Sequence, residues 1–319
     1  MVKRFNPDKR RRPKVDDYFG DWKWREALAE SMVPIIGKLY RSGVHLLMYG
    51  RPLSNSSPIE IMKLHRFVRE AEGNELSELE TYPVIEQIAK MKLMPCEIDI
   101  GEMVSHLLEN PQLKPEHYVN KTLEGQTRTK RSYPLRPKDV VLYGFGRIGR
   151  LITRILVTDT GAGANWRLRA VVIRDSGHED DLIKRASLLR NDSVHGTFPG
   201  TIRVNKKNNS LIVNGNEIFV IYANDPRKVK YKDYGIKKAT IIDNTGAWKD
   251  EEGLGQHTRN PSVDKVILTA PAKGKIKNIV FGINDEKLKQ DEKIVAAASC
   301  TTNAIAPPLK LINDAYKIV

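Results

Sequence analysis

The sequence contains only two cysteines in 319 residues, Cys96 and Cys300, and no apolar run long enough to span a membrane. Two cysteines so far apart do not suggest a disulfide framework, which favours a reducing compartment. A membrane-spanning helix needs about 20 predominantly apolar residues. The amino terminus also lacks the apolar segment of a secretory signal peptide. We therefore expect a cytoplasmic protein with no membrane partner and, in the absence of metal-ligand spacing, no metal site.

Acidic residues are outnumbered by basic ones, which gives a formal net charge of +14. Residues 1–14 contain seven Lys or Arg side chains and one Asp, so this segment alone contributes +6. A positive charge of this size suits polyanionic partners. Short charge runs, however, are usually solvated and disordered. We therefore expect 1–14 to be a disordered tail, with nucleic-acid binding as the less favoured role.

The chain divides into two parts with different patterns. Residues 15–137 are mostly helical in pattern, with one short strand at 44–49, and end in a linker rich in Lys, Arg, Thr and Pro. Capping boxes that start at Ser57 and Ser77 predict helices to about residue 72 and about residue 91. From residue 138 onward, strands alternate with helices, which is typical of an α/β fold with a doubly wound, mostly parallel sheet. Strands are predicted at 139–143, 168–173, 201–204, 211–213, 217–222, 239–243, 265–269, 278–281 and 294–298.

A glycine-rich turn follows the first strand of the second part. Gly144, Gly146 and Gly149 form a GxGxxG pattern that comes directly after a strand and opens a helix. Glycines at these positions let the backbone turn tightly and approach a pyrophosphate at the helix N-terminus. Asp175, at the end of the next strand, would accept hydrogen bonds from the adenosine ribose. The pattern predicts a dinucleotide-binding domain of Rossmann type.

Cys300 lies between hydroxyl-bearing residues in the run ASCTTN at 298–303. A strand before it and a helix after it would place its thiol at a helix N-terminus, where free N–H groups and the helix dipole favour the thiolate. This placement is typical of a catalytic nucleophile, and a buried, inert cysteine is the alternative. Nothing in the sequence around Cys96 indicates activation.

Together these motifs resemble the phosphorylating glyceraldehyde-3-phosphate dehydrogenases. The resemblance covers roughly residues 138–319, and ASCTTN is its most specific part. The other matching runs are YGFGRIGRL at 143–151, DSVHG at 192–196, NTG at 244–246, APAKG at 270–274 and IND at 312–314. Residues 15–137 lie outside the ordinary enzyme and resemble the extension of a long bacterial subfamily of dehydrogenase-like proteins.

The resemblance implies an NAD-dependent oxidoreductase of glycolysis or gluconeogenesis that acts on glyceraldehyde 3-phosphate and inorganic phosphate, as a homo-oligomer. Cys300 would attack the aldehyde carbon, a hydride would pass to NAD, and phosphate would cleave the resulting thioester. Ser299 and Thr301 would contact substrate or phosphate. The implied cofactor-binding residues are Gly144, Gly146, Arg147, Ile148, Gly149, Asp175, Asn224, Thr245, Gly246, Trp248 and Thr269.

Some residues depart from the family pattern. Arg174 precedes Asp175, and because an arginine there can accommodate a 2′-phosphate, NADP stays open as a cofactor. Asn224 replaces a basic residue, and Trp248 replaces a phenylalanine. Pro308, beside a first proline, predicts a second break in the helix that follows Cys300.

The chain ends at Val319, before the positions of the family's base histidine, its phosphate-binding arginine and its antiparallel sheet. We therefore expect an inactive fragment in which 138–300 form the cofactor-binding domain and 301–319 begin a truncated catalytic domain with exposed apolar groups. Two alternatives remain open. One is an erythrose-4-phosphate dehydrogenase, and the other is a non-catalytic homologue that binds a dinucleotide or nucleic acid.

Overall fold

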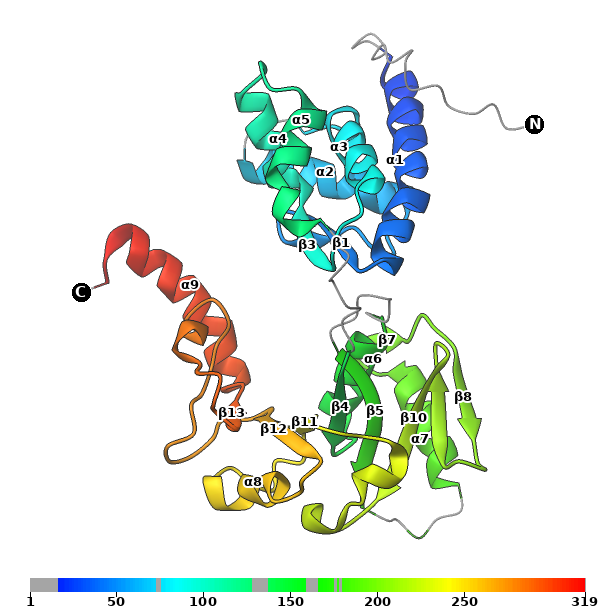
Figure 1. Ribbon diagram of the computed structural model, residues 1–319, viewed down its shortest axis with the longest axis vertical. Coiled ribbons are helices and arrows are strands. Elements are labelled where there is room, and N and C mark those ends of the chain that lie inside the picture. Colours follow the sequence, from blue (N-terminus) through cyan, green and yellow to red (C-terminus); the bar gives the residue numbers. More distant parts are fainter. Residues whose placement is uncertain are drawn as a thin grey trace. The chain divides into compact units, whose positions relative to one another are not determined.

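The computed structural model describes residues 17–72, 76–127, 137–158, 166–174, 177 and 180–318, without the side chains of 68–72. These residues form two compact units, one ending at 127 and the other beginning at 137, which Figure 1 colours from blue to green and from green to red. The predicted tail 1–14 and the predicted ribose ligand Asp175 lie outside the described residues.

The first unit packs five α-helices and a small sheet around one apolar core, which includes Leu28, Met32 and Ile85. Both predicted capping boxes are confirmed, because the Glu60 and Glu80 carboxylates accept the N–H groups of Ser57 and Ser77. The elements are α1 (Tyr18–Arg41), β1 (Val44–Met48), β2 (Arg51–Pro52), α2 (Pro58–Glu72), α3 (Glu78–Lys90), β3 (Cys96–Asp99), α4 (Ile100–Glu109), α5 (Pro115–Thr122) and a 3₁₀ turn, η2 (Glu124–Gln126).

The prediction of a single strand in this unit was wrong, because the sheet has three strands in the order β2-β1-β3. Strand β3 pairs in parallel with β1, and Leu46 lies opposite Ile98. The Asp99 carboxylate at the end of β3 accepts the N–H groups of Tyr49 and Gly50, at 3.0 and 2.7 Å. A strand this short depends on these pairings across about 50 residues of sequence, so its own residues give little local signal.

The second unit is built on an eight-stranded sheet in the order β13-β12-β11-β4-β5-β10-β9-β8, parallel from β13 to β10. This confirms the predicted α/β fold of Rossmann type. Its elements are β4 (Lys138–Tyr143), α6 (Arg147–Thr158), β5 (Trp166–Ile173), α7 (Asp181–Arg190), β6 (Asn191–Asp192), β7 (Gly196–Thr197), β8 (Ile202–Asn205), β9 (Ser210–Val213), β10 (Asn216–Tyr222), η3 (Pro226–Lys228), η4 (Tyr231–Tyr234), β11 (Ala239–Asp243), α8 (Glu251–Thr258), β12 (Val263–Leu268), η5 (Asp285–Lys287), β13 (Ile294–Ala296) and α9 (Cys300–Tyr316).

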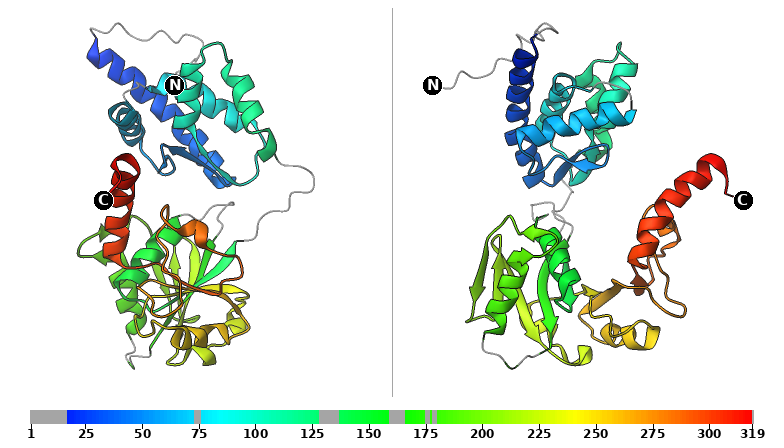
Figure 2. Two further views of the ribbon diagram at one scale, coloured as in Figure 1. Left: turned by 90° about the vertical axis from the view of Figure 1, so that its left-hand side faces the viewer. Right: turned by 180° about the vertical axis from the view of Figure 1, so that it is seen from behind.

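Both faces of this sheet are buried. Along β4, Leu142 packs in a core with side chains of α6 and α7, whereas Val141 packs in a second core with Leu254 of α8. Figure 2 shows this sheet and its green and yellow helices from two further sides. Successive side chains of a strand point to opposite faces, so a strand covered on both sides must be apolar throughout. Strands β5 and β11 lie on opposite sides of β4, which places a topological switch point at the carboxyl end of β4.

The predicted strand at 278–281 was wrong, because the described chain there forms only an isolated bridge between Asn278 and Ala296. The Asn278 side chain instead closes a turn, accepting the N–H of Ala272 at 2.9 Å and donating to its carbonyl at 3.2 Å. The last strand is also shorter than predicted, since it ends at Ala296 and Ala298 has a φ of 56°.

The predicted proline break after Cys300 was wrong as well, because α9 runs without interruption through Pro307 and Pro308. No described side chain of α9 is buried, so water can satisfy the carbonyl groups that the two prolines leave without a donor. Exposed apolar residues of α9 include Ile305, Leu311 and Ile312, which confirms the expected apolar exposure. None of the helices in the described ranges is long and apolar enough to cross a membrane.

Candidate functional site

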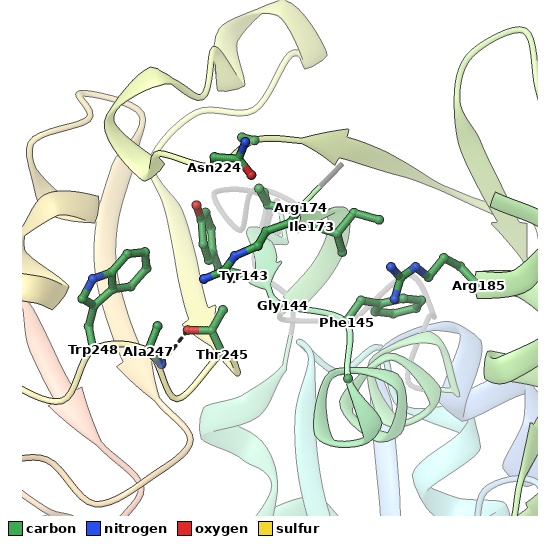
Figure 3. A pocket seen from close by; sticks show the side chains of 13 residues that line it. Tyr143, Gly144, Phe145, Ile173, Arg174, Arg185, Asn224, Thr245, Ala247 and Trp248 are labelled. Atoms are coloured by element: carbon green, nitrogen blue, oxygen red, sulfur yellow. Dashed lines mark hydrogen bonds between the residues drawn. The ribbon is translucent and has the colours of Figure 1, made fainter. Parts of the chain in front are cut away.

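A cavity of about 300 Å³ opens at the carboxyl ends of β4, β5, β10 and β11. It lies at the switch point of the sheet, where doubly wound folds bind their ligands. Figure 3 shows side chains from all four strand ends around it. The described lining residues are Tyr143, Gly144, Phe145, Gly146, Val172, Ile173, Arg174, Arg185, Ala223, Asn224, Thr245, Ala247 and Trp248.

The three glycines of the fingerprint meet three different steric demands. Gly144 has a φ of +96°, and a Cβ there would lie 3.0 Å from Cγ2 of Thr245. A Cβ on Gly149 would lie 2.6 Å from the carbonyl oxygen of Gly144, so α6 can approach the strand only without a side chain. A Cβ on Gly146 would meet no described atom within 4 Å. The open space beside Gly146 is therefore where a ligand can approach the backbone.

Helix α6 begins directly after this turn, at Arg147. The first N–H groups of a helix have no partner within it and, with the helix dipole, favour an anion. The backbone groups of Arg147 and Ile148 are thus suited to hold a pyrophosphate. The side chain of Arg147 is used elsewhere, since its Nη2 donates to Oγ of Ser193 at 2.8 Å and its Nε lies 3.3 Å from Oδ2 of Asp192.

Asp192 organises the turn that receives Arg147. Its Oδ1 accepts the N–H groups of Val194 and His195, both at 2.9 Å. These hydrogen bonds stabilise the carboxylate and hold the pKa of Asp192 well below its usual range. The turn therefore presents a fixed negative charge to the arginine at the start of α6.

The opposite side of the cavity is formed by the loop after β11, which a buried carboxylate shapes. Oδ1 of Asp243 accepts the N–H of Thr245 at 2.8 Å and its hydroxyl at 2.7 Å. The Thr245 hydroxyl in turn accepts the N–H of Ala247 at 3.1 Å. Oδ2 of Asp243 accepts Nε2–H of His257 at 3.0 Å, and both side chains are fully buried. Sequence analysis missed this pair, which was signalled only by an acidic residue at a strand end and a histidine 14 residues later.

Asn244 connects this loop to the glycine turn. Its backbone N–H donates to the carbonyl of Tyr143 at 2.7 Å. Its side-chain Nδ2 donates to the carbonyl of Ile242 at 3.1 Å and lies 3.5 Å from that of Gly144. These hydrogen bonds fix the loop after β11 against the glycine turn after β4.

Three rings pack together beside the cavity. The ring centroids of Tyr143 and His257 are 4.7 Å apart, and Trp248 lies 5.9 Å from Tyr143 and 5.6 Å from His257. Burial, together with the carboxylates of Asp243 and Asp225, raises the pKa of Tyr143 to about 12. Tyr143 thus stays neutral, and Trp248 is a half-buried wall of the cavity, on which an adenine could stack.

The remaining lining residues give the cavity a positive end. Arg174 is exposed, and Arg185 forms an ion pair with Asp181 at 3.2 Å. None of the described lining residues is acidic. Figure 3 shows Arg174 and Asn224 on neighbouring strand ends.

The predicted site residues fall into two groups by position. Gly144, Gly146, Asn224, Thr245 and Trp248 line the cavity, whereas Arg147, Ile148, Gly149, Gly246 and Thr269 are not among its described lining residues. Thr269 lies next to the end of β11, where its N–H and hydroxyl both donate to the carbonyl of Asp243 at 3.1 Å.

Cys300 is the first residue of α9 and is exposed. Ser299 caps the helix, its Oγ accepting the N–H of Thr302 at 3.0 Å and lying 2.9 Å from Oγ1 of Thr301. Asn303 donates to the carbonyls of Ala297 and Ser299, at 2.8 and 2.9 Å, which holds the turn before the helix. The residues that the structure describes include no group of three or more His, Cys, Asp or Glu that could hold a metal ion.

Comparison with known proteins identifies relatives of this arrangement. Residues 138–251 match the family model for the NAD binding domain of glyceraldehyde 3-phosphate dehydrogenase. The chain is 51% identical over 292 residues to a glyceraldehyde-3-phosphate dehydrogenase-like protein of Pseudomonas aeruginosa, an alignment that covers 90% of this chain and 63% of the relative. It is 41% identical over 180 residues to glyceraldehyde-3-phosphate dehydrogenase of Thermotoga maritima, which covers 56% of this chain and 50% of that enzyme.

The chain thus spans from about half to somewhat under two thirds of the length of these relatives. An alignment of 292 residues cannot fit within 138–319, so the Pseudomonas relative also matches part of the first unit. The predicted cofactor, NAD, is confirmed by the description of the matched domain. Residues 138–251 are thus similar to the NAD binding domain of glyceraldehyde 3-phosphate dehydrogenase, and most of the chain is similar to a glyceraldehyde-3-phosphate dehydrogenase-like protein.

Proposed function

We propose that this chain binds NAD in the cavity at the switch point and contributes the cofactor domain and the nucleophile of a phosphorylating aldehyde dehydrogenase. The observation that carries the proposal is the meeting of the Gly144 turn and the Thr245 loop at one open cavity. In this proposal 138–300 form the cofactor domain, 301–319 belong to a catalytic domain, and 15–137 are a separate module.

The residues present fit a dinucleotide. The open space beside Gly146 lies next to the N-terminus of α6, which suits the pyrophosphate. Trp248 and Asn224 would contact the adenine side, and Asp175 would hold the ribose. Thr245, Gly246 and Thr269 would complete the cofactor contacts. When bound, NAD supplies a hydride acceptor.

Cys300 would supply the covalent chemistry. Its thiolate sulfur would bond to the aldehyde carbon of glyceraldehyde 3-phosphate, and oxidation of that carbon leaves an acyl group on the sulfur. An oxygen of inorganic phosphate would then take the acyl group and release the thiolate. Ser299 and Thr301, whose hydroxyls lie 2.9 Å apart beside Cys300, would contact substrate or phosphate.

Calorimetric titration of the 319-residue chain with NAD and NADP tests the binding part. Gly146→Val should raise the Kd for NAD by about tenfold or more, about 1.4 kcal/mol, because the side chain fills the space of the ligand. Gly255→Ala is the matched control, since a Cβ there also meets no described atom within 4 Å. Asp175→Ala should weaken NAD binding as well. Unchanged affinity in the Gly146 variant would contradict the proposed site.

The catalytic part is tested in a longer protein that also carries the family's base histidine and phosphate-binding arginine, by NADH formation with phosphate and either glyceraldehyde 3-phosphate or erythrose 4-phosphate, using Cys300→Ser as the control. Faster turnover of the triose phosphate, lost in the control, supports the proposal. Faster turnover of erythrose 4-phosphate would instead identify the protein as an erythrose-4-phosphate dehydrogenase. NAD binding without turnover of either aldehyde would favour a non-catalytic role.

A further inference from the structure

A second groove of the second unit, of about 590 Å³, has five basic side chains and one acidic side chain among its eleven described lining residues. Its two walls are formed by the segments that precede β11 and β12. The groove therefore lies at the amino ends of these strands, whereas the proposed NAD cavity lies at the carboxyl ends of the sheet strands. The lining residues are Arg227, Lys228, Val229, Lys230, Tyr231, Lys232, Asp233, Arg259, Asn260, Pro261 and Ser262. None of them lines the NAD cavity.

The fold fixes which side chains of this segment face the solvent. Val229 and Tyr231 are 4% and 1% exposed and belong to the core under α8. Lys228, Lys230 and Lys232 alternate with them and are exposed. Because the apolar residues anchor the chain, the three ammonium groups are held on its outer side.

The other wall is tied to the first through a buried amide. Nδ2 of Asn260 donates to the carbonyl of Val229 at 2.7 Å, and its Oδ1 accepts the N–H of Ser262 at 3.1 Å. The connection between α8 and β12 is thereby fixed against the lysine segment. The two walls of the groove are therefore held together by hydrogen bonds of a buried side chain.

The charges of the groove are largely uncompensated. Residues 227–238 contain six basic side chains and one acidic one. Arg227 pairs with Asp225 at 2.8 Å, whereas Lys228, Lys230 and Lys232 form no ion pair with any described residue. Asp233 is the one acidic residue among the described lining residues, and a groove with such an excess of positive charge concentrates anionic ligands.

We propose that this groove binds the phosphodiester backbone of nucleic acid. A phosphate chain matches several adjacent cations at once, and each neutralised phosphate releases counterions. The groove offers no platform for stacking bases, since its one aromatic residue, Tyr231, is buried. Contacts restricted to phosphates carry little sequence information, so binding is expected to be insensitive to sequence.

Fluorescence anisotropy with a labelled single-stranded RNA of about 20 nucleotides, at salt concentrations from about 50 to 200 mM, tests this proposal. The variant Lys228→Ala/Lys230→Ala/Lys232→Ala should raise the Kd by about tenfold or more and reduce the slope of log K against log salt by about 2. The matched control, Lys184→Ala/Lys207→Ala/Lys289→Ala, removes the same charge from exposed positions outside the groove. It should leave the slope close to that of the parent protein.

Four results would overturn the proposal. An equal loss of RNA affinity in the two triple variants would show that binding responds to net charge alone. Loss of binding only when Lys9, Arg10, Arg11 and Arg12 are replaced by Ala would assign it to the tail. Displacement of the RNA by saturating NAD would assign it to the cofactor cavity. Tighter binding of an acidic peptide of equal charge would favour a protein partner.

Discussion

His257 donates a hydrogen bond of 3.0 Å to Asp243 in the interior of the second unit, where both side chains are fully buried. The other oxygen of the same carboxylate accepts two hydrogen bonds from Thr245, at the wall of the NAD cavity. The pair therefore links the helix α8 to the loop that lines the cavity. Because the pair is fully buried and holds Thr245 through Asp243, we expect it to position this loop.

Replacing His257 by Phe should destabilise the protein and weaken NAD binding. The substitution removes a hydrogen bond to a buried carboxylate, a loss of about 2 kcal/mol in the free energy of unfolding. Urea titration measures the first effect, and calorimetry at a temperature where the variant is folded measures the second. The control is His195→Phe, because His195 is about half exposed and its contact with Asp192, at 3.2 Å, is a surface interaction worth about 1 kcal/mol or less. An equal loss of NAD affinity in the His257 and His195 variants would contradict the positioning role.

Gly149→Ala should destabilise the second unit by about 1–3 kcal/mol, because overpacking forces the backbone to move. The new methyl group would lie 2.6 Å from the carbonyl oxygen of Gly144. Gly146→Ala is the control, since its methyl group meets no described atom within 4 Å. Chemical denaturation of both variants checks the prediction, which fails if Gly146→Ala is the less stable of the two.

The stability of the protein should fall in acid partly through Asp192. Hydrogen bonds from Val194 and His195 lower its pKa in the folded state below the ordinary value of 3.8. A lowered folded pKa adds stability that is fully present above about pH 4 and is lost as the pH falls through the folded pKa. Asp192→Asn should therefore show a shallower decline between about pH 4 and pH 2 in parallel urea titrations. Identical pH profiles for the two proteins would exclude this contribution.

The two cysteines should differ in reactivity. Cys300 is exposed at a helix N-terminus, whereas Cys96 is half-buried and burial raises its pKa. Thiolates are the reactive species, so iodoacetamide at about pH 7.5 should modify Cys300 faster by about tenfold or more. Peptide mass spectrometry against time measures both rates, with Cys300→Ser as the variant that should lose the fast reaction. Faster labelling of Cys96 would be the contrary result.

Local patterns were sufficient to predict the elements that form the cavity proposed to bind NAD. The apolar strand before Gly144, the three glycines and the helix after them are consequences of neighbouring residues. The backbone at Gly144 has a positive φ, and the backbone at Gly149 makes a close contact. Glycine is the residue that suits both positions, so the glycine pattern in the sequence predicts this local geometry. The capping boxes at Ser57 and Ser77 are equally local, because each is closed by a residue three positions later.

The failures share a different cause. Strand β3 exists because Leu46 pairs with Ile98, and the segment at 278–281 is not a strand because Asn278 bonds to Ala272. Neither outcome can be deduced from β-propensity, which mainly reflects packing with neighbours in space. The continuous helix through Pro307 and Pro308 likewise depends on its exposure to water.

The sequence by itself therefore determined the Rossmann-type fold, the glycine turn of the proposed NAD site and the helix that begins at Cys300, because steric and capping requirements act over a few residues. Only the tertiary structure decided that His257 donates a hydrogen bond to Asp243. It alone also decided that Lys228, Lys230 and Lys232 line one groove, where Asn260 donates a hydrogen bond to Val229. These relationships join elements that the sheet order brings together, and hydrogen bonds between distant segments leave no periodic trace in the sequence.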